Sequence, residues 1–243
     1  PAALPMVLRN NSTPPPLPTI TPFILILVGA HFQPSESYLS KWLLETSVSK
    51  DQLNQIVWPS NQWASLAAFA LVHASLRRRF VSEAVVLVSA AVAGLATRLF
   101  LLFGRSLATA TLSQFTYSMT TASLASALPS LAIRIGGKAG LATTTVTAGI
   151  VIATSGSRLA AAALGQYVVL NNGGSLEPLF QVSAASMVVS LLATLLVWRE
   201  AAHAVEESRP VSLRNSLATL RVPGLRPVLL VMVALLSSHA MFE

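Results

Sequence analysis

The sequence predicts an all-α integral membrane protein, and its composition and apolar stretches carry that prediction. Of the 243 residues, 53% are hydrophobic and only 10% are charged, against roughly 25% charged residues in an ordinary soluble domain. The mean hydropathy is +0.64, and several apolar stretches reach the roughly 20 residues that a helix needs to cross a bilayer. Because a backbone in lipid must satisfy its own hydrogen bonds, we expect these stretches to be helices.

The expected elements follow from where apolar runs begin and where turn residues stop them. Residues 1–18 carry Pro14-Pro15-Pro16 and are expected to form an extended arm, because this composition cannot build a helix. Glycine and asparagine then mark tight connections at Gly104-Arg105-Ser106, Gly136-Gly137-Lys138 and Asn171-Asn172-Gly173-Gly174. We expect spans at residues 19–44, 56–76, 81–103, 107–133, 140–170, 176–198 and 226–242. The first six form a bundle over 19–198, a basic loop covers 199–225, and a seventh helix covers 226–243.

The first span contains a polar interruption, His31-Phe32-Gln33-Pro34-Ser35-Glu36-Ser37-Tyr38-Leu39. Pro34 removes a helical donor, and Glu36 places a carboxylate inside an apolar run, which costs free energy unless the carboxylate is paired, protonated or facing a cavity. Two interpretations stay open. Either the helix breaks at a substrate or proton site, or it ends near Phe32 and leaves Glu36 in the headgroup region beside Lys41.

Basic residues gather in alternate connections. They follow the second, fourth and sixth expected spans, at Arg77, Arg78, Arg79, Arg134, Lys138, Arg199, Arg209, Arg214, Arg221 and Arg226. By the positive-inside rule these connections face the cytosol, or the matrix or stroma of an organelle. Topology thus explains the formal charge of +7 better than nucleic-acid binding does. The sequence does not distinguish a plasma membrane from a mitochondrial inner membrane.

Two arginines also lie inside the expected spans. Arg158 lies deep in the fifth span and is a candidate partner for Glu36 across the bundle, whereas Arg98 lies late in the third span, where we expect its side chain to reach the interface. The chain has no cysteine, so thiolate metal sites and disulfides are excluded. Its residues also show no metal-ligand spacing, phosphate loop or catalytic triad. We therefore expect no enzyme and no cofactor.

Six spans followed by a long basic connection and a seventh span are the plan of one half of a major facilitator transporter, although other six-helix proteins share it. Five short segments add a resemblance: Gln33-Pro34-Ser35-Glu36-Ser37-Tyr38-Leu39, Asn54-Gln55-Ile56 before Pro59, Leu76-Arg77, Tyr117-Ser118-Met119-Thr120 and Leu164-Gly165-Gln166. In this order and at similar separations they resemble segments of the reduced folate carrier and thiamine transporter family, solute carrier family 19. The resemblance covers residues 20 to 242 and implies a major facilitator-type six-helix bundle plus a seventh transmembrane helix.

The resemblance also implies a site. Glu36 matches the first-helix glutamate that contacts substrate in the family, but the charged fourth-helix position falls on Leu124 and the binding-site tyrosine on Ala127. The second-helix aromatic falls near Asn61, with Trp63 as a substitute. With Tyr117 from the fourth-helix segment, and with Arg158 added for its depth in the fifth span, the substrate-binding candidates are Glu36, Asn61, Trp63, Tyr117, Leu124, Ala127 and Arg158.

Two functions stay open. The first is a transporter of a folate- or thiamine-like organic solute that works by alternating access, with this vitamin-like solute and the lipid bilayer as its partners. The second is a transporter-derived accessory subunit, without transport activity, whose partners are other membrane subunits of a large complex. Leu124, Ala127 and Ala74, which replaces the aspartate of the family's second loop, motivate the second, as does the end of the sequence at Glu243.

Overall fold

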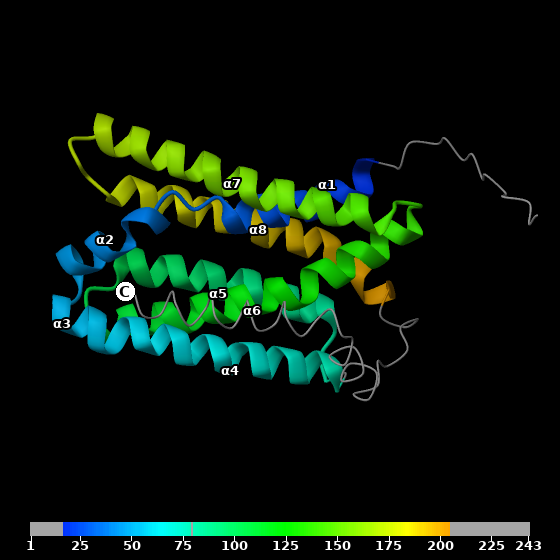
Figure 1. Ribbon diagram of the computed structural model, residues 1–243, viewed down its shortest axis with the longest axis horizontal. Coiled ribbons are helices and arrows are strands. Elements are labelled where there is room, and N and C mark those ends of the chain that lie inside the picture. Colours follow the sequence, from blue (N-terminus) through cyan, green and yellow to red (C-terminus); the bar gives the residue numbers. More distant parts are fainter. Residues whose placement is uncertain (1–16, 79, 205–243) are drawn as a thin grey trace, which may run out of the picture. The chain divides into compact units, whose positions relative to one another are not determined.

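Helices make up the fold of the residues that the computed structural model describes, which are 17–78 and 80–204 (Figure 1). In chain order they are α1 Leu17–His31, the 3₁₀ turn η1 Glu36–Tyr38, α2 Leu39–Thr46, α3 Lys50–Gln52, the π-helical turn η2 Leu53–Val57, α4 Trp58–Arg77, α5 Glu83–Phe103, α6 Leu107–Lys138, α7 Thr143–Asn171 and α8 Glu177–Ala204. This range contains no β-strand. The predicted all-α class is confirmed for it.

The described helices belong to one compact unit, Pro1–Glu206, and a second unit covers Glu207–Glu243. The second unit includes the expected seventh span, 226–242, which lies outside the described residues. Most of the expected arm, residues 1–16, and most of the expected basic loop, residues 205–225, lie outside them as well.

Three of the described helices are long and apolar enough to cross a membrane, namely Glu83–Phe103, Thr143–Asn171 and Glu177–Trp198. They correspond to the third, fifth and sixth expected spans. The second and fourth expected spans are also long helices, α4 and α6, but polar side chains such as Asn61, Gln62 and Gln114 lower their hydropathy. A helical membrane protein is therefore supported, while the arrangement of six spans plus one stays a prediction.

Two of the connections between helices test the turn predictions. The turn after α7 is confirmed, because Gly173 and Gly174 adopt φ angles of 61° and 86°, which other residues rarely adopt. The turn expected at Gly136-Gly137-Lys138 is wrong, because α6 continues through it to Lys138. Gly136 instead lets α7 approach: a Cβ there would lie 2.6 Å from Val146 Cγ2. The turn follows at Gly140, with φ at 80°.

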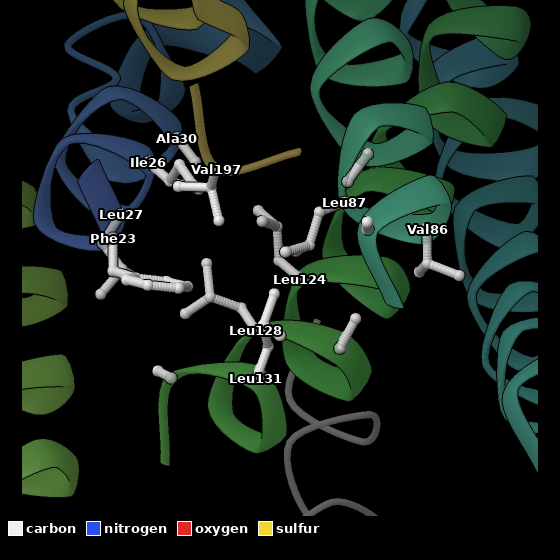
Figure 2. Close-up of a cluster of buried hydrophobic side chains, with 14 of the residues drawn as sticks. Phe23, Ile26, Leu27, Ala30, Val86, Leu87, Leu124, Leu128, Leu131 and Val197 are labelled. Carbon is white, nitrogen blue, oxygen red and sulfur yellow. The ribbon is translucent and has the colours of Figure 1, made fainter. Parts of the chain in front are cut away.

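The helices pack in two sets with a cluster of buried apolar side chains between them, and a second cluster surrounds Trp42, Leu101 and Phe180. One set consists of α1, α7 and α8, the other of α4, α5 and α6, and α5 also packs along α8 (Figure 1). Between them, Phe23 of α1 points toward Leu128 of α6, and Ile26 of α1 lies beside Val197 of α8 (Figure 2). Because small side chains dominate the rest of this core, the helix backbones approach closely.

An ion pair joins two helices of the second set. The Arg134 guanidinium of α6 contacts the Glu83 carboxylate at the start of α5, and the Ser130 hydroxyl donates to Glu83 Oε1 at 2.6 Å. Arg134, expected in a connection, therefore lies within a helix, because α6 is longer than its apolar stretch indicates.

Candidate functional site

The interruption of the first helix is built into the packing of α1 on α8. α1 ends at His31, and four residues without helical structure or in a turn separate it from η1. The Ser186 hydroxyl of α8 donates to the Phe32 carbonyl at 2.8 Å, and the Ser35 backbone N–H donates to Ser183 Oγ at 3.2 Å. Serine side chains thus satisfy backbone groups that Pro34 and the break leave open, which is how a broken helix is tolerated away from water.

The helix α7 also packs against the break, at Pro34. A Cβ at Gly165 would lie 2.9 Å from the Pro34 carbonyl oxygen, so only glycine permits this approach. With α8 and α7 both in contact, the segment from Pro34 to Ser35 is buried. The next residue, Glu36, is thereby fixed at the start of η1.

Glu36 turns toward α6, where it meets Tyr117. The Tyr117 hydroxyl donates to Glu36 Oε1 at 2.6 Å, a short, charge-assisted hydrogen bond. Lys41 faces a different carboxylate, with its Nζ 3.8 Å from Glu45 Oε1. The helix thus ends at His31, as the second interpretation expects, but the exposed Glu36 side chain contacts Tyr117 and not Lys41. A substrate or proton site at the break stays a prediction.

A cavity of about 220 Å³ opens beside the Glu36–Tyr117 pair, between α1, α6 and α7. Its polar end is formed by His31, Gln33, Glu36, Tyr117 and Arg158, and its apolar end by Leu27, Leu124, Leu128 and Ile150. A second cavity, of about 320 Å³, shares His31, Gln33, Glu36 and Arg158 with it. The pair of cavities combines an apolar wall with a few convergent polar groups, as binding sites for small organic molecules do.

Four of the residues predicted for the site line this one cavity: Glu36, Tyr117, Leu124 and Arg158. Arg158 and Glu36 thus share a wall, although their side chains form no ion pair within 4.0 Å. Leu124, at the position where the resemblance places a charge, lies in the apolar part of the cavity.

The other three predicted residues lie elsewhere. The amide oxygen of Asn61 accepts a hydrogen bond from Ser118 Oγ at 2.9 Å, which ties α4 to α6. Trp63 is 72% exposed, and Ala127 is fully buried in the core. None of the three is among the residues that line the Glu36 cavity.

Arg98 corrects an expectation drawn from the sequence. Its side chain is only 2% exposed and does not extend to a surface, and its buried Nε has no hydrogen-bond partner. Next to Arg98 in sequence, Thr97 Oγ1 donates a hydrogen bond of 2.8 Å to Thr116 Oγ1, which joins α5 to α6. Arg98 therefore lies inside the helix bundle, one position from this contact between α5 and α6.

Sequence reasoning did not find several polar residues of the cavity, among them His31, Gln33, Thr121 and Thr154. A signal for two of them was present. Thr121 follows Tyr117 by four positions and Thr154 precedes Arg158 by four, a spacing that places both residues on one helix face. His31 and Gln33 line the cavity because the first helix is interrupted at these residues.

Comparison with known families agrees with this picture. The family model described as reduced folate carrier matches residues 20–212, which is well over half of the chain and includes every residue of the Glu36 cavity. No curated protein matches the sequence.

Proposed function

The chain belongs to the reduced folate carrier family, and we propose that it carries a small organic solute of the folate or thiamine type across a membrane by alternating access. The solute binds in the Glu36 cavity between α1, α6 and α7. The proposal gives Glu36, Tyr117 and Arg158 the polar contacts and Leu124 an apolar one.

The observation that carries this proposal is the short hydrogen bond from Tyr117 to Glu36 at the edge of the cavity. A carboxylate among helices of a membrane protein costs free energy, so such residues are typically retained for a substrate, an ion or a proton. Tyr117 orients the carboxylate and leaves its second oxygen available to a solute. Discontinuous first helices of this kind provide binding groups in several transporter folds.

The shape of the cavity supports a solute with two unlike ends. Arg158 and Glu36 lie at one end, and Leu124, Leu128 and Ile150 lie at the other. A ring system on the leucines and a polar group near Arg158 would satisfy both ends, since apolar burial supplies affinity and the polar groups fix the orientation.

Uptake into proteoliposomes tests the proposal, with labelled folate and labelled thiamine supplied in separate experiments. The Glu36→Gln variant keeps the size of the side chain and removes its charge, and we expect uptake of the transported solute to fall about tenfold or more, since a lost charged hydrogen bond costs that much. Glu45→Gln is the matched control, because Glu45 pairs with Lys41 at an exposed site. Uptake that is the same in both variants would remove Glu36 from the site.

The apolar residues Leu124 and Ala127 favour the alternative, an accessory subunit of a membrane complex without transport activity. Purification from the native membrane separates the two functions. A stable complex with other membrane proteins, together with no uptake of either vitamin, supports the alternative, whereas uptake by the isolated chain rejects it.

A further inference from the structure

A groove lies between α4 and α5, over the middle of α6, and it shares no residue with the Glu36 cavity. Its volume is about 130 Å³, and most of its wall is apolar, including Leu71 of α4, Val85 of α5 and Met119 of α6. Leu71 is 62% exposed, so the groove is open along its side. Because α5 is long and apolar enough to cross a membrane, we expect the occupant of this groove to come from the lipid.

Three serines line the same groove, one on each helix: Ser75, Ser89 and Ser123. The Ser89 hydroxyl donates to the Val85 carbonyl of its own helix at 2.9 Å, so it does not oppose an apolar occupant. Ser123 Oγ is buried and has no hydrogen-bond partner among the described residues. A buried hydroxyl without a partner costs free energy, so an occupant that brings an acceptor is favoured. The ester carbonyls of a glycerolipid are such acceptors, whereas a plain hydrocarbon has none.

Helical spacing places an arginine at one end of the groove. Leu71, Ser75 and Arg78 follow one another at intervals of four and three residues, which puts them on one face of α4. This face continues to Arg78, because Arg78 ends α4 with right-handed helical backbone angles. The rise of 1.5 Å per residue sets Arg78 about 10 Å beyond Leu71 along the helix. By the same spacing Arg77 lies on the opposite side of α4.

The positive charge of Arg78 is available to a ligand. Its side chain is exposed and pairs with no carboxylate of the part of the chain that the structure describes. The Glu83 carboxylate lies at the same end of the bundle, at the start of α5, but Arg134 and Ser130 already engage it. The groove thus combines an apolar wall with a cation at one end. A phosphate group is complementary to that cation, since a guanidinium binds phosphate through two parallel hydrogen bonds.

We propose that this groove binds an anionic glycerophospholipid, with the phosphate on Arg78, an ester carbonyl on Ser123 and one acyl chain along Leu71, Val85 and Met119. An anionic headgroup is preferred over a zwitterionic one because arginines near the membrane surface attract negatively charged lipids. The inference is independent of the proposed transport function, because the groove and the Glu36 cavity have no residue in common.

Photocrosslinking of the full chain in phosphatidylcholine proteoliposomes tests the proposal. The probe is phosphatidylglycerol with a diazirine in one acyl chain, present at low mole fraction, and mass spectrometry maps the adducts. We expect adducts within residues 71–75 and 81–89 at about fivefold higher yield than with the matching phosphatidylcholine probe, as one interfacial arginine provides. Ile152 and Leu159, which are 71% and 74% exposed on α7, control for lipids that touch the protein without binding, and both probes should label them equally.

The two adjacent arginines provide a matched pair of variants. Arg78→Gln should lower the yield in the groove to that of the phosphatidylcholine probe, and Arg78→Lys should retain most of it, because the charge is kept. Arg77→Gln removes an equally exposed class of charge from the other side of α4 and should change little. Ser75→Phe fills the groove without removing a charge, and it should lower the yield with both probes in protein that elutes normally from a size-exclusion column.

Three outcomes overturn the proposal. Equal yields in the groove with the two probes would mean that its apolar wall takes any lipid. Equal losses in Arg77→Gln and Arg78→Gln would mean that the surface charge as a whole attracts lipid, and not this site. No adduct in the groove from either probe, while Ile152 is labelled, would mean that protein rather than lipid covers it.

Discussion

Substitution of Gly29 by alanine tests the close contact on which the site is built. A Cβ at position 29 would lie 2.6 Å from the Ser186 carbonyl oxygen and 2.7 Å from the Ser190 nitrogen. Both are backbone atoms of α8, so neither can rotate away. α1 and α8 must separate, and the break that follows α1 would move with it.

The magnitude follows from three contributions. Overpacking of a well-packed contact costs about 1–3 kcal/mol. Separation also weakens the hydrogen bonds from Ser186 Oγ to the Phe32 carbonyl, at 2.8 Å, and from Ser190 Oγ to the Ile26 carbonyl, at 3.1 Å, each worth about 0.6 kcal/mol between membrane helices. Alanine in place of glycine stabilises the helix by about 1 kcal/mol, because its helix propensity is higher. We expect a net loss of about 2 kcal/mol in the free energy of unfolding.

Gly156→Ala provides the matched control, because a Cβ at position 156 would meet no atom within 4 Å. It should leave the free energy of unfolding unchanged or raise it by up to about 1 kcal/mol. Titration of the micellar protein with sodium dodecyl sulfate, followed by circular dichroism, compares the two variants. Equal stability of Gly29→Ala and Gly156→Ala would show that α1 and α8 do not meet as closely at Gly29 as described.

Three further predictions concern single contacts. Tyr117→Phe removes the hydroxyl that orients Glu36 and should lower uptake about threefold to tenfold, measured as initial rate. Ser186→Ala leaves the Phe32 carbonyl without its donor and should cost about 1 kcal/mol in the same detergent titration. Glu83→Gln breaks the ion pair with Arg134, in which the Glu83 side chain is 20% exposed and the Arg134 side chain 24%. It should lower the free energy of unfolding by about 1–2 kcal/mol, less than the loss of a fully buried pair would.

Each of these variants has a control in the chain. Tyr167→Phe changes a tyrosine that is 65% exposed and lies away from the cavity. Ser89→Ala removes an exposed hydroxyl that bonds only within its own helix, to the Val85 carbonyl. Lys41→Gln breaks an exposed ion pair. If a control changes uptake or stability as much as its partner variant does, the contact in question does not matter as described.

The helices were predictable because apolar runs and turn residues act locally. α5 begins within two residues of its expected start and ends at Phe103 as expected. The role of Gly136 was not predictable, since a glycine that serves a turn and one that admits a neighbouring helix look alike until the neighbour, here Val146, is placed.

The candidate site was predictable where the resemblance supplied residues and the helical spacing placed them on one face. Glu36 and Tyr117 were found from the resemblance and Arg158 from its depth in an apolar span, and all three line one cavity. The inward direction of Arg98 was not, because α5 is apolar around its whole circumference and gives no polar face to orient it. The hydroxyls that hold the break, Ser183 and Ser186, are far from it in sequence and emerged only from the packing of α1 on α8.

The break in the first helix is expected to open a polar cavity, accessible to water, among helices that lie in lipid. Single cysteines in this cysteine-free chain test it most directly, by the rate at which a charged, membrane-impermeant thiol reagent labels them in proteoliposomes. Thr121→Cys lines the cavity, and Ser113→Cys lies on the same helix at 0% exposure. We expect rapid labelling at position 121 and none at position 113, whereas equally slow labelling of both would show that water does not reach the cavity.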